Sequence, residues 1–233
     1  MRKILYALYT AAYKLKAWFS PWLSMANTTC FLLRMNVSRT NRVTLEGGLV
    51  KSTSLNVQGR NNEVVSSSGL CECDIKIFGN NNPLILNRAK LFFGEIVVRG
   101  NNCVVEFADG SSLGSGTIVC MGEGTSITIG PETMLADNVN IWNSDTHPIF
   151  DAQRNLLNPS ASIRIGRHVW LGKGATVLKG VTIGDNAIVG MNALVTKDVS
   201  PGSLSVGAPS REIKTGVNWE RCFITDFKKD DGA

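Results

Sequence analysis

The sequence is poor in histidine and in charge. Only two histidines occur among 233 residues, and Asp, Glu, Lys and Arg together make up 18% of the chain. Two histidines cannot supply a three-histidine zinc site. This low share of charged residues excludes an arginine-rich nucleic-acid binder. Lys and Arg number 24 against 19 for Asp and Glu, a mild positive balance that suits an anionic substrate or membrane surface. We therefore expect no nucleic-acid partner.

The chain also lacks paired cysteine motifs. None of its six cysteines forms a CxxC pair, and their spacing does not resemble the disulfide framework of a small secreted protein. We interpret them as reduced, buried thiols, which predicts a cytoplasmic location. The cysteines are Cys30, Cys71, Cys73, Cys103, Cys120 and Cys222.

The N-terminal 25 residues include no apolar run of about 20 residues, the length that a membrane-spanning helix needs. Lys14 and Lys16 interrupt the segment, and no small-residue cleavage site of a signal peptide follows. On a helix the segment would carry one apolar stripe, formed by Ile4, Leu5, Leu8, Ala11, Ala12, Leu15, Phe19 and Trp22. This stripe could lie in a membrane interface or pack on protein, either on the chain itself or on a neighbouring subunit. The tyrosines on the opposite face favour packing on protein.

A period of six residues runs through the C-terminal third. Aliphatic residues occupy Ile165, Leu171, Val177, Ile183, Val189 and Val195, and a small or branched residue follows each of them four positions later. Neither a helix nor simple strand alternation gives this spacing. Short strands separated by a corner every six residues do give it, so the pattern predicts an all-β solenoid of parallel coils.

Earlier in the chain the repeat lengthens to 20 or 21 residues, with glycine and asparagine at the same place in each copy, as corners with positive φ require. We predict an N-terminal helix and lead-in over residues 1–35, a β-helix over 36–209 and a tail over 210–233. Ile141 and Ile165 share the hexad phase, so residues 143–162 form an excursion from the β-helix.

Three motifs resemble the hexapeptide-repeat acyltransferases: THP at 146–148, IGRHVWLGKGATVLKGVTIGDNAIVGMNALVTKDV at 165–199 and VGAPSREI at 206–213. This resemblance implies a left-handed parallel β-helix with three hexads per coil, and usually a homotrimer with active sites between subunits. Within the family the chain looks most like bacterial capsular polysialic acid O-acetyltransferases, through NSDTHPI at 143–149, HVWLG at 168–172 and Trp219.

The resemblance implies catalytic residues. His147 matches the family's general base, and histidine, with a usual pKa near 6.5, can accept a proton at neutral pH. Trp170 would line the reaction centre. Asp145 would either fix the imidazole tautomer or act as a turn residue. Trp142 and Asn143 are candidates for lining the acceptor pocket.

Acetyl-CoA is the implied acyl donor, and no metal is expected. The resemblance places the coenzyme contacts on Gly172, Lys173, Gly190, Met191, Thr196, Lys197 and Arg211, with Lys214 more distant. The expected function is O-acetylation of a bacterial surface polysaccharide, a capsule or O-antigen with sialic acid among its candidate sugars. The alternatives are an acetyltransferase of a small acceptor, such as a free sugar, amino acid or antibiotic, and a non-catalytic β-solenoid scaffold.

Overall fold

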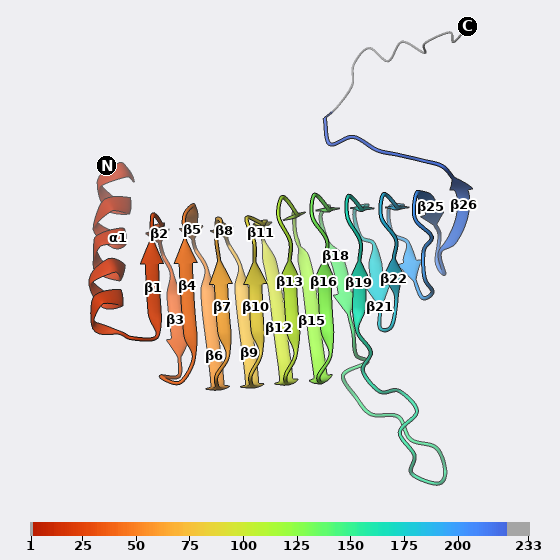
Figure 1. The fold of residues 1–233 in the computed structure, drawn as a ribbon, viewed down its shortest axis with the longest axis horizontal. Helices are drawn as coiled ribbons and strands as arrows, with labels where there is room; N and C mark the ends of the chain where they lie inside the picture. The colour runs from red at the N-terminus through yellow and green to blue at the C-terminus, as the bar shows by residue number, and fades with distance from the viewer. Residues whose placement is uncertain (1, 223–233) are drawn as a thin grey trace, which may run out of the picture.

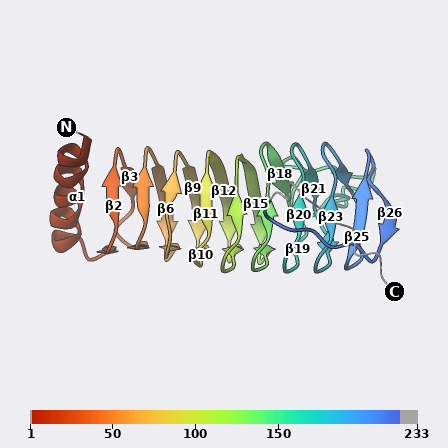
Figure 2. The same ribbon diagram turned by 90° about the horizontal axis from the view of Figure 1, so that it is seen from above.

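A computed structural model describes residues 2–222 as one helix, α1 (Arg2–Phe19), followed by a β-helix with three flat sheets. Figures 1 and 2 show α1 beside the first coil, at one end of a long prism of stacked strands. Each turn of the chain contributes one strand to each sheet in succession.

The three sheets are named A, B and C after their first strands β1, β2 and β3. Sheet A contains β1 (Leu23–Ala26), β4 (Arg42–Glu46), β7 (Glu63–Ser66), β10 (Pro83–Leu86), β13 (Val104–Phe107), β16 (Ser126–Ile129), β19 (Ile163–Ile165) and β22 (Thr182–Ile183). Sheet B contains β2 (Thr29–Phe31), β5 (Leu49–Lys51), β8 (Leu70–Cys71), β11 (Lys90–Phe92), β14 (Ser112–Leu113), β17 (Met134–Leu135), β20 (Trp170–Leu171), β23 (Ile188–Val189), β25 (Ser203–Val206) and β26 (Arg211–Thr215). Sheet C contains β3 (Arg34–Val37), β6 (Ser54–Arg60), β9 (Asp74–Asn80), β12 (Gly94–Asn101), β15 (Gly116–Glu123), β18 (Val139–Trp142), β21 (Thr176–Leu178) and β24 (Leu194–Val195).

Strand pairing confirms the predicted parallel β-helix. From β19 to β24 the paired strands are offset by 18 residues, as Trp170 is from Ile188, which corresponds to three hexads per coil. In the N-terminal coils the offset is 20 or 21 residues, as from Leu23 to Val43 and from Val43 to Val64. The left hand of the coil follows from the family resemblance.

The first coil begins earlier than expected. Strand β1 starts at Leu23, whereas the sequence pattern placed the start of the β-helix near residue 36. Val37 pairs with Val57, so Arg39 of the first coil stands in register with Gly59 and Gly79 of the next coils. The glycine that marks the later copies is therefore missing from the first one, and the repeat is hard to recognise there.

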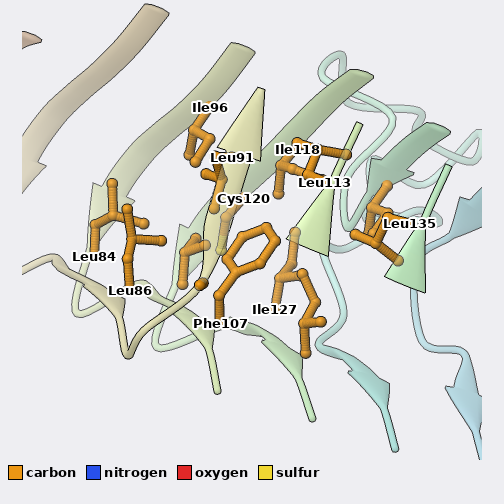
Figure 3. Close-up of a cluster of buried hydrophobic side chains, with 14 of the residues drawn as sticks. Leu84, Leu86, Leu91, Ile96, Phe107, Leu113, Ile118, Cys120, Ile127 and Leu135 are labelled. Carbon is orange, nitrogen blue, oxygen red and sulfur yellow. The ribbon is translucent and has the colours of Figure 1, made fainter. Parts of the chain in front are cut away.

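The interior is a continuous column of aliphatic side chains. All six first-position hexad residues from Ile165 to Val195 are buried, as predicted, and so are their fourth-following partners. Figure 3 shows the middle of this column, where Phe107 lies among Leu86, Leu113 and Ile127. Burial of these side chains supplies the main stabilising term of the fold.

The Gly–Asn corners have the conformation that the sequence predicts. Gly79 and Gly100 have φ values of +114° and +139°. A Cβ on Gly79 would lie 1.8 Å from the carbonyl oxygen of Gly100 on the next coil, so no larger residue fits. The buried amide of Asn82 also donates to the Gly100 oxygen at 2.9 Å, which satisfies the corner backbone internally.

Helix α1 docks with the face opposite to the one expected. Tyr9 and Tyr13 lie against the first coil, whereas Leu8 and Leu15 of the predicted packing stripe are exposed. The expectation that this stripe packs on the chain itself is therefore wrong. Among residues 2–222, no helix is both long and apolar enough to cross a membrane.

The cysteines are partly as expected. Four thiols are buried, and burial raises the pKa of Cys30 to about 11, which makes it unreactive. Cys71, however, is half-buried and Cys222 is exposed, so the prediction of uniformly buried thiols is wrong for these two.

Candidate active site

The excursion from the β-helix is a folded hairpin. It leaves sheet C after Trp142 and rejoins sheet A at Ile163, and it projects from one corner of the prism (Figure 1). Phe150 and Leu156 form an antiparallel bridge near its tip. The carboxylate of Asp151 accepts three hydrogen bonds within the turn, which lower its pKa and hold the turn closed.

His147 lies at the base of this hairpin, with its side chain exposed. It lines a pocket of about 220 Å³ together with Met121 and Gly122 of β15 and with Pro148 and Ser160 of the hairpin. One side of this pocket is therefore rigid β-helix and the other is the hairpin. An exposed imidazole at the edge of a small cavity can accept a proton from a bound hydroxyl.

Asn158 fastens the two arms of the hairpin around His147. Its Nδ2 atom donates to the His147 carbonyl oxygen at 2.9 Å and to the Asp145 carboxylate at 2.8 Å, and its Oδ1 accepts from the Ile149 amide at 2.6 Å. These bonds fix the backbone that carries the imidazole. The sequence reasoning missed Asn158, because its partners come from the opposite arm of the hairpin.

Asp145 is held by Lys179 and not by the histidine ring. The Lys179 Nζ atom, on the corner that follows β21, bonds to the Asp145 carboxylate, and this bond together with that from Asn158 lowers the pKa of Asp145. Within residues 2–222 the His147 imidazole has no hydrogen bond to this carboxylate; the two residues meet only through the His147 amide and the Asp145 carbonyl oxygen, 2.7 Å apart. The carboxylate in this structure anchors the hairpin to the β-helix.

Asn143 does not line an acceptor pocket, contrary to expectation. Its side chain is fully buried, accepts from the Met121 amide at 2.7 Å and donates to the Thr125 hydroxyl at 2.9 Å. The alternation of β18 directs Val139, Ile141 and then Asn143 inward, so the amide takes a core position. Its role is to end the strand where the hairpin leaves.

Trp142 and Trp170 both lie on outer surfaces. Trp142 is half-buried on sheet C, between Val119 and Leu178 of the neighbouring strands. Trp170 is exposed on sheet B. Both therefore remain available to a ligand or to a second subunit.

The C-terminal tail covers the outer surface next to Trp170. After β26 it folds back, and the buried indole of Trp219 stacks on His168 with ring centroids 4.4 Å apart. The Trp219 Nε1 atom donates to the His168 carbonyl oxygen at 2.7 Å, and its ring lies 6.0 Å from that of Trp170. His168, at a corner of the β-helix, is thus half-covered by the tail.

The predicted coenzyme residues fall on two different corners. Gly172 and Lys173 lie between sheets B and C, with Gly190 and Met191 directly above them on the next coil and Arg211 nearby on β26. A Cβ on Gly172 would lie 2.8 Å from the Met191 amide nitrogen, so this glycine serves close stacking of the coils. Lys214, on the same strand as Arg211, pairs with Leu204.

Thr196 and Lys197 lie on the other corner, between sheets C and A. This is the corner that carries the hairpin and, one coil earlier, Lys179. Within one chain, His147 and Lys197 therefore lie at one corner of the prism. Trp170, Lys173 and Arg211 lie on another part of it.

Comparisons with known proteins agree with this architecture. A family model described as "Bacterial transferase hexapeptide (six repeats)" matches residues 162–197. The resemblance to the hexapeptide-repeat acyltransferases that the sequence predicts is therefore confirmed.

More particular likenesses are to polysialic acid O-acetyltransferases. The enzyme of Neisseria meningitidis is 31% identical over 134 residues, covering 56% of this chain and 62% of the relative. That of Escherichia coli O1:K1 is 43% identical over 107 residues, 46% of this chain and 35% of the relative. The crystal structure of the polysialic acid O-acetyltransferase OatWY superimposes with a TM-score of 0.71 at 27% identity, covering 89% of this chain and 96% of that one.

Proposed function

We propose that the chain is an acetyl-CoA-dependent O-acetyltransferase that modifies a hydroxyl of a bacterial surface polysaccharide. The observation that carries the proposal is the exposed His147 imidazole, held by a pinned hairpin beside a pocket on a hexapeptide-repeat β-helix. The likeness to polysialic acid O-acetyltransferases supports a glycan acceptor. The excess of Lys and Arg suits an acidic sugar such as sialic acid.

The reaction is direct transfer in a ternary complex. As an acceptor hydroxyl attacks the thioester carbonyl carbon of acetyl-CoA, a ring nitrogen of His147 takes the hydroxyl proton. The new C–O bond forms, the C–S bond breaks, and the imidazolium returns its proton to the coenzyme thiolate. No cysteine and no covalent enzyme intermediate takes part.

The remaining residues bind and position the substrates. Lys197 and Arg211, with Lys173, suit the phosphates of the coenzyme, and Gly172 and Gly190 allow its pantetheine arm to approach the backbone. Trp170 and Trp142 present flat apolar surfaces to the acetyl group and the acceptor. Asp145 positions His147 through the hairpin.

The separation of these residues over two corners favours a homotrimer with the active site between subunits. A neighbouring copy could present Trp170 and Lys173 to the His147 of the first chain. The exposed apolar side chains of the hairpin, including Ile149, Phe150 and Leu157, suit such a contact. The enzyme would work in the cytoplasm, where acetyl-CoA is available.

The test is mass spectrometry of acetyl-CoA reactions with a panel of bacterial polysaccharides and their monomers. His147→Ala should lose about 10²- to 10⁴-fold in kcat while still binding coenzyme. Lys90→Met is the control and should retain activity, because Lys90 is exposed on β11, away from the hairpin and the tail. Full turnover by His147→Ala would overturn the mechanism, and acetylation of monomers alone would favour the small-acceptor alternative.

A further inference from the structure

Helix α1 is fixed on the β-helix by one face. The Tyr9 ring packs edge-on against Phe31 with centroids 5.2 Å apart, and the Tyr13 hydroxyl donates to the Leu33 carbonyl oxygen. The Thr10 hydroxyl accepts from the Cys30 amide at 3.0 Å. These contacts determine which face of the helix points away from the protein.

The opposite face is apolar and uncovered. At 3.6 residues per turn, Leu8, Ala11 and Leu15 lie opposite Tyr13. Leu8 is 63% exposed, Leu15 59% and the neighbouring Trp18 85%. Two leucines and a tryptophan on one side of an 18-residue helix are unusual on a surface that meets only water.

Basic residues flank this apolar face. The helix contains Arg2, Lys3, Lys14 and Lys16, and its 18 residues include no Asp or Glu. Lys14 and Lys16 are exposed on either side of the leucines. An apolar stripe with cationic borders and an exposed tryptophan is the pattern of helices that lie in the interface of an anionic membrane.

We propose that α1 attaches the protein to an anionic phospholipid surface, with Leu8, Leu15 and Trp18 inserted among the acyl chains and Lys14 and Lys16 at the headgroups. A second copy of the same helix would fit this face poorly, because it would bring two uniformly cationic segments together. The proposal is independent of the catalytic assignment.

The position of α1 also sets the orientation. The helix covers the first coil at one end of the β-helix (Figures 1 and 2), and its exposed face points away from the coils. A membrane on that face therefore meets the end of the prism, and the sheets with the hairpin extend away from the lipid.

The experiment is flotation of the full-length chain with vesicles of phosphatidylcholine alone or mixed with phosphatidylglycerol. The wild-type protein should float with the anionic vesicles. With the neutral vesicles most of it should stay in the bottom fraction. The triple variant Leu8→Gln, Leu15→Gln, Trp18→Gln should bind at least about tenfold more weakly. Lys14→Gln and Lys16→Gln should each cost about fivefold, with the loss disappearing in high salt.

The matched control is Phe92→Gln, which removes an exposed aromatic ring from sheet B, away from α1, and should float like the wild type. Circular dichroism and gel filtration establish that every variant folds. Equal flotation of the triple variant, or failure of the wild type to bind anionic vesicles at low salt, would overturn the proposal. The proposal would also be overturned if the wild type formed an oligomer in the absence of vesicles and the triple variant did not, since a second copy would then cover this face.

Discussion

The indole of Trp219 stacks on the imidazole of His168 with an angle of 7° between their planes, although 51 residues separate them. This contact fastens the C-terminal tail to the coil that carries Trp170. Arg221 adds bonds to the Ser112 hydroxyl and the Glu132 carbonyl oxygen further along the prism. The tail is thus part of the folded surface next to the candidate site.

Trp219→Phe should retain the stacking but lose the hydrogen bond to the His168 carbonyl oxygen, at a cost of about 1 kcal/mol. Trp219→Ala should release the tail, which hydrogen exchange of residues 211–222 would detect as faster exchange. Trp18→Ala serves as control, because that exposed ring makes no comparable contact and its loss should leave exchange in the tail unchanged. Unchanged exchange in Trp219→Ala would show that other contacts hold the tail.

Lys179→Met should reduce kcat roughly 10- to 100-fold with little change in KM for acetyl-CoA, because the hairpin loses an anchor and His147 is misplaced. Asp145→Asn should have an effect of the same size. If Asp145 instead orients the imidazole directly, Asp145→Asn alone should cost about 10⁴-fold, as in catalytic triads. Steady-state kinetics distinguish the two, with Lys90→Met, an exposed lysine on β11, as the neutral control.

The Asp145–Lys179 pair predicts a pH dependence of loop stability. The folded-state pKa of Asp145 is lowered, so its stabilising contribution is complete above the unfolded pKa, about 3.9, and disappears as the pH falls through the folded value. The difference in hairpin hydrogen exchange between wild type and Asp145→Asn should stay constant from about pH 8 to pH 5 and shrink below about pH 4. A difference that shrinks already near neutral pH would contradict this assignment.

Asn143→Ala should destabilise the fold by about 2–4 kcal/mol, because it leaves the Met121 backbone and the Thr125 hydroxyl without their buried partner. Urea denaturation would measure the loss. At temperatures where the variant is folded, KM for the glycan should match that of the wild type. A selective rise in that KM would restore Asn143 to the acceptor pocket.

Gly172→Ala should be more disruptive than Gly190→Ala. The added methyl group at Gly172 would lie 2.8 Å from the Met191 backbone nitrogen, which cannot move without shifting the coil, whereas at Gly190 it meets the Val206 side chain. We expect a loss of about 1–3 kcal/mol for Gly172→Ala and less for Gly190→Ala in thermal unfolding. The reverse order would show that the coils can slide.

The interior of the β-helix could be predicted from the sequence, because the spacing between neighbouring inward residues along the chain is regular. The six-residue spacing of Ile165, Leu171 and Val177 alone predicts that they are buried, and they are. The first coil could not be located in the same way, because Arg39 stands where Gly59 and Gly79 mark the later copies of the repeat. The docked face of α1 does not follow from hydrophobicity, because the hydroxyls of Tyr13 and Thr10 bond to specific backbone partners on the first coil.

The candidate site was predictable only in part. His147 stands out through its rarity and its Pro148 neighbour, but Lys179 reaches Asp145 across 34 residues and a change of sheet, which no local pattern encodes. The burial of Asn143, by contrast, follows from a local pattern. Continuing the alternation of Val139 and Ile141 by two residues would have placed this side chain in the core.

The regular stacking of sheet C fixes the distance between the hairpin and the end of the β-helix that carries α1. Five strand-to-strand steps separate β3 from β18, and at about 4.8 Å each they hold the base of the hairpin about 24 Å from the end covered by α1. Inserting or deleting one coil would change this height by a single step without altering the corner from which the hairpin projects. Under the proposed membrane attachment, the number of coils would set how far the hairpin stands from the lipid surface.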